Sequence, residues 1–225
     1  MATGLTLAAW AAMSWFLWIS GRWSLHVSSR IFWVIPFGAV VLTVGAIGRL
    51  VTARIAEPAP FTARRAWPLA ALAVPVVVVL AMPPIDLGAF AAERRGDVAA
   101  AAVYDGRRSE SGPVNQVDVA TAPYSPDVMR ALIQRAGEEV SFIGFVTHPE
   151  GTLADEFVLN RFVIRCCVDD ALNARVRVVD VPPGEYPEGT WLRVTGRIYP
   201  VPEEVLLDAT KLERVAKPKD PYIQQ

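Results

Sequence analysis

The chain has 225 residues, a hydrophobic content of 52% and a formal net charge of −1 at pH 7. This hydrophobic content is high for a soluble protein, and the charge is unevenly distributed. Residues 1–97 carry eight Arg against four acids, whereas residues 137–225 carry ten Lys or Arg against fifteen acids. The acidic C-terminal part would repel phosphate backbones, so we exclude nucleic acid as a partner.

The N-terminal part, residues 1–86, is predicted to be a membrane region with three transmembrane helices. Three apolar blocks without charged residues predict helices at about 3–20, 31–48 and 67–85. About 20 apolar residues cross a hydrocarbon core of about 30 Å, and a helix without a polar face is typical of lipid contact. The first block lacks the basic start and the small-residue cleavage site of a signal peptide, so we expect it to be retained.

The topology follows from the distribution of arginines. Three spans would place the N-terminus and the C-terminal domain on opposite sides of the bilayer. The loop over residues 49–66 holds four Arg, and four more flank the other side at Arg22, Arg30, Arg94 and Arg95. The two counts are equal, but the concentration of charge in one loop favours a cytoplasmic loop. We therefore predict an extracytoplasmic C-terminal domain.

A linker and a short helix are predicted next. Residues 87–124 are rich in Ala, Ser, Gly, Pro and charge, which is typical of a linker. Over residues 125–137, Ser125 suits an N-cap, Pro126 suits the first helical position, and Gly137 suits the C-terminal cap.

From Glu138 onward, alternation with period two predicts five strands, at residues 140–147, 157–168, 174–180, 191–201 and 205–212. Five strands within residues 138–215 favour an all-β OB-like barrel. Gly144 and Gly196 lie inside strands and would permit the bends that close such a barrel. Residues 216–225 are interpreted as a polar tail.

The segment "RFVIRCCVDDA", residues 161–171, contains the only two cysteines of the chain. Strand alternation places Cys166 on the apolar face, where it is interpreted as a small buried hydrophobe. Cys167 shares the other face with two arginines, which would lower the pKa of its thiol. A disulfide between them is disfavoured, because adjacent Cα atoms are only ~3.8 Å apart and ordinary bridges span at least ~4.4 Å.

A metal site is the alternative interpretation of this segment. A turn after the strand would bring Asp169 or Asp170 back toward Cys167, and His148 lies in another inter-strand loop. Thiolate, imidazole and carboxylate groups suit zinc or a similar transition metal. The predicted ligand set is Cys166, Cys167, Asp170 and His148. The competing interpretation is a simple turn in which Asp170 bonds its own backbone.

The segment "RFVIRCCVDDA", with "GEEVSFIGFV" before it and "GTWLRVTGRI" after it, resembles the bacterial YcgQ-like permease-subunit family. So do "LGAFAAERRG" and the terminal "PKDPYI". Cys166, Cys167 and Asp170 match the most characteristic positions of that family. Asp169 departs from the pattern, since a small residue is usual there, and no role is assigned to it. The resemblance implies a multi-pass bacterial cell-membrane protein beside a YcgR-like permease of the organoarsenical-permease type.

Two functional hypotheses follow. The first is an accessory subunit of a membrane permease. The helices of this subunit would lie in the lipid bilayer, and its C-terminal domain would scaffold or gate the transport partner. The second is a membrane-tethered metal-binding or redox module that uses the Cys-Cys-x-Asp segment and carries bound metal or a thiol with a pKa well below ~8.5. No arrangement of catalytic residues is recognisable in the sequence, so we do not expect an enzyme.

Overall fold

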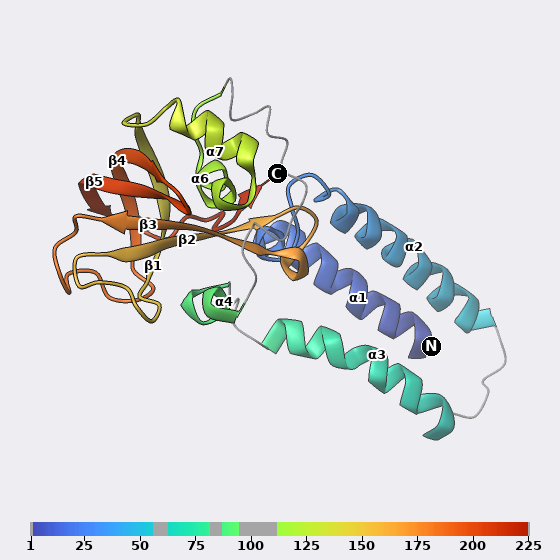
Figure 1. The fold of residues 1–225 in the computed structure, drawn as a ribbon. Coiled ribbons are helices and arrows are strands. Elements are labelled where there is room, and N and C mark those ends of the chain that lie inside the picture. The colour runs from blue at the N-terminus through green and yellow to red at the C-terminus, as the bar shows by residue number, and fades with distance from the viewer. Residues whose placement is uncertain (1, 56–62, 82–86, 95–111, 225) are drawn as a thin grey trace. The chain divides into compact units, whose positions relative to one another are not determined.

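The computed structural model describes residues 2–55, 63–81, 87–94 and 112–224. The chain divides into two compact units, Met1–Ile85 and Asp86–Gln225. The described elements of the first unit are helices, whereas the second is built around a sheet that closes into a barrel (Figure 1). The boundary lies within one residue of the end predicted for the membrane region.

The first unit contains the helices α1 (Ala2–Ile19), α2 (Val34–Ile55) and α3 (Ala63–Ala81), with the short 3-10 helix η1 (Arg22–Leu25) after α1. Helix α1 contacts both α2 and α3. Two tryptophans of α1 contribute hydrogen bonds to these contacts. Trp15 Nε1 donates to Thr43 Oγ1 of α2 at 3.2 Å, and Trp10 Nε1 donates to the carbonyl oxygen of Leu72 in α3 at 2.9 Å.

Two helices are long and apolar enough to cross a membrane, over Ala2–Ile19 and Val34–Ala53. The described residues therefore support two of the three predicted spans. Helix α3 is apolar over Trp67–Ala81, and these roughly 15 residues rise only about 22 Å, less than a hydrocarbon core. Residues 82–85 of the predicted third span lie outside the described part. A signal sequence near the N-terminus would pass the same test of length and composition. We therefore call α1 and α2 candidate spans.

The second unit begins before the predicted barrel domain. It includes the helices α4 (Ala89–Arg94), α6 (Gln116–Thr121) and η3 (Ala122–Tyr124). The predicted linker over 87–124 is therefore wrong at both ends, and residues 95–111 lie outside the described part. Every residue of α6 is buried. Six residues are too few to show a helical period, so this helix left no periodic signal in the sequence.

Helix α7 (Pro126–Ile133) confirms the predicted short helix. The Ser125 side chain accepts a hydrogen bond from Val128 N, and Pro126 occupies the first turn. The helix ends at Ile133, earlier than predicted. Gly137 then adopts a φ of 82°, which favours glycine, and its N–H donates to Ile198 O at 2.8 Å. The glycine thus turns the chain into the first strand.

Five strands form a closed barrel, as predicted. They are β1 (Glu139–Thr147), β2 (Phe157–Ile164), β3 (Leu172–Val179), β4 (Trp191–Val201) and β5 (Glu204–Arg214). The strand order is β1-β4-β5-β3-β2, and an additional β1–β2 pairing closes the ring. The β3–β5 pair is parallel, and the other four pairs are antiparallel.

The barrel is stabilised by a small apolar cluster between α6 and strands β2 and β3 and by two bigger clusters. The larger one joins the strands to α7 and includes Phe142, Leu159, Val178, Leu192 and Leu207 from the strands, with Val128 and Leu132 from the helix. The second cluster brings α4 and the C-terminal tail together with strand residues, and it includes Ala92, Phe145, Phe162, Ile164 and Tyr222. Burial of such side chains contributes roughly 1.5–3 kcal/mol each before entropy is counted.

The predicted polar tail over 216–225 is wrong at its end. Tyr222 is only 2% exposed, and its hydroxyl oxygen accepts a hydrogen bond from Leu87 N at 3.3 Å. The next two residues form β6 (Ile223–Gln224), which pairs in parallel with β2. The end of the chain is therefore part of the domain.

At Gly144 and Gly196, where bends were predicted, the structure shows close approaches between neighbouring backbones. A side chain at Gly144 would collide with the backbone of Asn160 on β2, and one at Gly196 would collide with the backbone of Asp208 on β5. The register of the β4–β5 pair also shifts between Thr195 and Gly196. Both glycines thus let neighbouring backbones approach at bends of the barrel.

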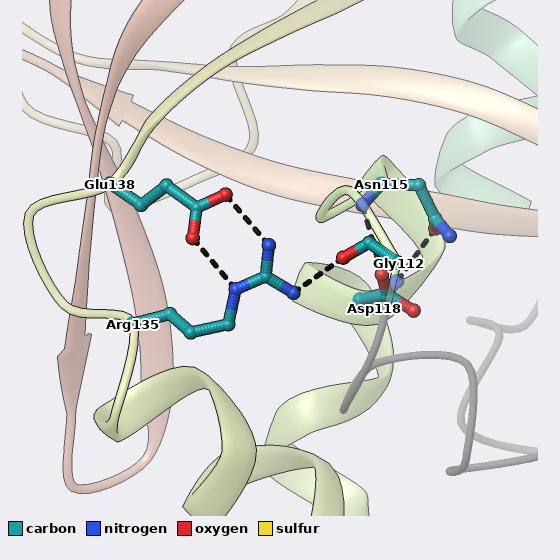
Figure 2. A network of polar contacts seen from close by, with 5 residues as sticks. All are labelled: Gly112, Asn115, Asp118, Arg135 and Glu138. Atoms are coloured by element: carbon teal, nitrogen blue, oxygen red, sulfur yellow. Dashed lines mark hydrogen bonds and ion pairs between the residues drawn. The ribbon is translucent and has the colours of Figure 1, made fainter.

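The buried carboxylate of Asp118 forms a capping box with Asn115 at the start of α6 (Figure 2). Asn115 N donates to Asp118 Oδ2 at 2.9 Å, and Asn115 Oδ1 accepts from Val117 N and Asp118 N in return. Nearby, Arg135 binds both carboxylate oxygens of Glu138 and donates to Gly112 O, each at 2.7 Å. Burial raises the pKa of Asp118 to about 6, although the Asn115 bond and the Arg135 charge act to lower it.

Because the pKa of Asp118 is raised, we expect helix α6 to become more stable as the pH falls. Because the folded protein holds the proton of Asp118 more tightly than the unfolded chain, stability rises as the pH falls from about 7 toward 4. We expect the protection factor of amides 117–121 against hydrogen exchange to increase about tenfold between pH 7.5 and pH 5. Asp118→Asn should abolish this increase, whereas Asp127→Asn, at a side chain that is 79% exposed, should retain it. An unchanged increase in Asp118→Asn would contradict the assignment.

Candidate functional site

The two cysteines follow the end of β2, where the chain leaves the barrel before it returns in β3. Strand β2 ends at Ile164, and Arg165, Cys166 and Cys167 lead into the single 3-10 turn η4 (Val168–Asp170). We call residues 165–170 the cysteine turn.

The carboxylate of Asp170 organises the cysteine turn. Its Oδ1 accepts from Arg165 N at 3.1 Å, and its Oδ2 accepts from Cys166 N at 2.8 Å and Cys167 N at 3.4 Å. In return, the Cys167 side chain accepts from the backbone of Asp170. Backbone donors that are bound to a side chain cannot continue a strand ladder, so β2 ends here. The predicted turn role of Asp170 is confirmed.

Both thiols are accessible on this turn. Cys166 is exposed and Cys167 is partly exposed. The two sulfur atoms and a carboxylate oxygen of Asp170 all lie within 4.8 Å of one another. Within the described ranges, no other group of three or more His, Cys, Asp or Glu side chains is placed to hold a metal ion. The structure therefore brings together three of the four predicted ligands.

The electrostatics of the turn disfavour a reactive thiolate at Cys166. A side-chain hydrogen bond with Cys167 raises the pKa of the Cys166 thiol, and the charges of Cys167 and Asp170 act in the same direction. A reactive thiol requires the opposite shift, to well below about 8.5. A bound cation would shift the equilibrium from thiol to thiolate, because it displaces the thiol protons and is attracted by the negative groups.

The geometry of the group fits a transition-metal ion. With a zinc–sulfur bond of about 2.3 Å, two sulfur ligands of a tetrahedral site lie about 3.8 Å apart. Donor atoms within 4.8 Å of one another therefore need to move by only about 1 Å. Rotation of exposed side chains permits such a movement. Three donors would leave one of four coordination positions open.

His148 does not belong to this group. It is exposed and directly follows β1, whose last residue, Thr147, pairs with Val158 near the start of β2. The cysteines follow the other end of β2, about 20 Å along the strand at ~3.3 Å per residue. The predicted role of His148 as a fourth ligand is therefore wrong for this arrangement.

The predicted faces of the cysteine segment are also wrong. The strand was expected to continue to Val168, which would have buried Cys166 and placed Cys167 on the same face as Arg161 and Arg165. Because β2 stops at Ile164, the alternation stops with it, and Cys166 is exposed. The Arg161 guanidinium instead donates to the carbonyl oxygens of Asp220 at 3.2 Å and Pro221 at 3.3 Å.

Sequence reasoning missed the contribution of the C-terminal tail to this site. Strand β6 pairs with β2 at Val163 and Ile164, immediately before the cysteine turn. Together with the Arg161 bonds, this pairing fixes the point where β2 ends. The signal in the sequence was the segment "DPYI", which is more apolar than the residues before it.

These features define a class: a closed five-stranded barrel domain with an exposed two-cysteine turn, in a chain whose N-terminal helices are apolar enough for a membrane. Residues 115–225 match the family described as DUF1980 C-terminal domain. The matched region contains all five barrel strands and the cysteine turn. No curated protein and no solved structure matches the chain. The finer resemblance to YcgQ-like subunits stays a prediction.

The role of Asp170 in the turn leads to a stability prediction. Asp170→Ala removes the acceptor of three backbone N–H groups, and we expect it to lower the free energy of unfolding by about 1–2 kcal/mol. Hydrogen exchange at residues 165–167 should become faster. The matched control is Asp169→Ala, at the neighbouring exposed acid, which should leave that exchange unchanged. Equal exchange in both variants would show that Asp170 does not hold the turn.

Proposed function

We propose that this protein is a membrane-attached metal-binding module and that its cysteine turn holds a transition-metal ion. The observation that supports this function is the convergence of two accessible thiols and one carboxylate within 4.8 Å. Thiolate sulfur and carboxylate oxygen are ligands of zinc and related ions. The role is binding rather than catalysis.

Each residue of the turn has a distinct part in this proposal. The sulfur atoms of Cys166 and Cys167 bind the ion after losing their protons, and the exposed position of Cys166 admits the ion from solvent. Asp170 holds the two cysteines at the strand end through its three backbone bonds.

Membrane attachment is supported by α1 and α2, which are long and apolar enough to span a bilayer. The side on which the barrel domain lies depends on the number of spans. The extracytoplasmic location predicted above requires three. With two spans, the barrel domain and the four arginines of residues 49–66 share one side, and the positive-inside rule makes that side cytoplasmic. We propose this cytoplasmic location, where thiols stay reduced.

The barrel itself supports no nucleic-acid role. We infer the OB-like type from the strand order β1-β2-β3-β5-β4 around the ring, and many barrels of that type bind oligonucleotides. Here, however, residues 137–225 carry more acids than bases. On β4, Arg193 pairs with Glu213 at 3.7 Å. A surface of this charge does not attract phosphates.

Metal content tests the proposed function directly. We expect elemental mass spectrometry on the full-length protein, purified in detergent under reducing conditions after growth with added zinc and copper, to find about one transition-metal ion per chain. Cys166→Ser and Cys167→Ser should each lose most of it, and Asp169→Asn should retain it. Wild-type protein without metal, or serine variants with the full amount, would refute the proposal.

A second candidate function is that of an accessory subunit of a membrane permease, with the barrel domain scaffolding or gating the transport partner. The observation in its favour is the apolar surface of α2, where Phe37, Val44 and Ile47 are 62%, 65% and 57% exposed. Lipid tails or the helices of a YcgR-like multi-pass permease would cover such a surface.

The permease hypothesis predicts a co-purifying partner. Affinity purification of the full chain in a mild detergent should recover a membrane protein with several helices in comparable amount. Replacing Phe37 and Val44 on the exposed surface of α2 by alanine should reduce this recovery, whereas alanine at the exposed Leu153 of the barrel domain should not. Recovery of the chain alone would contradict this candidate and leave the metal site unaffected.

A further inference from the structure

We propose that the cysteine turn selects thiophilic ions that two sulfur ligands satisfy, with copper(I) as the representative, and that it binds zinc only weakly. This inference rests on the proposed function, because it names the class of ion that the same site takes. It is supported by the number and kind of donors that the turn leaves available for a metal.

The first step concerns Asp170, whose carboxylate is already engaged. An ionised carboxylate offers about four lone-pair sites, and three backbone N–H groups bind these two oxygens at 2.8–3.4 Å. Moving an oxygen onto a metal would weaken the bonds that build the turn. Asp170 is therefore a positioning residue, which acts through the backbone of the two cysteines.

The second step is a count of the remaining ligands. With Asp170 engaged, the turn offers two sulfur atoms, and the described part of the chain places no further His, Cys, Asp or Glu in this group. Structural zinc sites have four protein ligands, and catalytic zinc sites have three with a water. The turn thus supplies two protein ligands, one fewer than the three of a catalytic zinc site.

The third step is the chemistry of the donors. Thiolates are soft ligands and select copper(I), whereas carboxylates and carbonyls select magnesium, calcium and manganese. Copper(I) has a filled d shell and forms stable complexes with only two thiolates. The cysteine pair is thus a complete ligand set for copper(I) and an incomplete one for zinc.

The geometry permits the two-sulfur arrangement. With metal–sulfur bonds of about 2.3 Å, as in zinc sites, a linear S–metal–S unit spans about 4.6 Å. The donor atoms of the turn lie within 4.8 Å of one another. Cys166 is exposed and Cys167 is partly exposed, so an ion can enter without opening the barrel.

The test compares the two ions on the full-length protein in detergent, reduced and without oxygen. Copper(I) is titrated against a chromogenic copper(I) chelator, and zinc against a chromogenic zinc chelator. We expect one tightly held copper(I) and a zinc Kd of about 1 μM or weaker. Cys166→Ser and Cys167→Ser should each weaken copper(I) binding at least about a hundredfold, because one of two ligands is lost.

The aspartate variants separate a ligand from a positioning residue. Asp170→Asn keeps one oxygen in the turn, so we expect copper(I) affinity to fall less than about tenfold, and Asp169→Asn should leave it unchanged. Nanomolar zinc binding that Asp170→Asn abolishes would overturn this inference, since Asp170 would then be a zinc ligand, while the proposed function would stand. Failure to bind either ion would overturn both.

Discussion

Three backbone N–H groups converge on the carboxylate of Asp170, and the candidate site depends on this interaction. The bonds engage the backbone N–H groups of Arg165, Cys166 and Cys167, and β2 ends at Ile164. Had the strand continued, its alternation would have turned the thiols to opposite faces of the sheet. In the turn, both sulfur atoms instead lie within 4.8 Å of the same carboxylate.

The rest of the domain gives this turn a rigid base. Strand β6 pairs with the last residues of β2, and Arg161 binds the carbonyl oxygens of the tail. Phe162 and Ile164, on the strand itself, are 1% and 0% exposed within the second apolar cluster. A ligand pair on a fixed strand end loses less conformational entropy on binding than one on a mobile loop. The barrel and the tail thus hold the cysteine turn in a fixed place on the domain.

Much of the barrel could be predicted from the sequence, because its signals are local. Period-two alternation located all five strands, and Ser125 and Pro126 marked the start of the short helix. The bend predicted at Gly196 coincides with a register shift of the β4–β5 pair. Each of these signals reflects the preference of a residue for its own backbone conformation or for one face of a strand.

The wrong predictions have two causes. Some elements are ordered by contacts with distant segments, and in the cysteine turn a side chain competes with the strand for backbone hydrogen bonds. The six residues of α6 and the tail around Tyr222 are ordered by burial against strands far away in sequence. The end of β2 was misplaced because alternation predicts a longer strand, while Asp170 competes for its backbone. His148 was grouped with the cysteines because the register of β1 on β2, which separates them, is a property of the fold.

X-ray absorption at the edge of the bound metal tests the central claim most directly. For the loaded full-length protein, the account predicts a shell of about two sulfur atoms near 2.3 Å, reduced to about one in Cys167→Ser. A shell made only of nitrogen and oxygen, or a sulfur shell unaltered in Cys167→Ser, would show that the metal is bound elsewhere. The cysteine turn would then be a structural feature of the barrel alone.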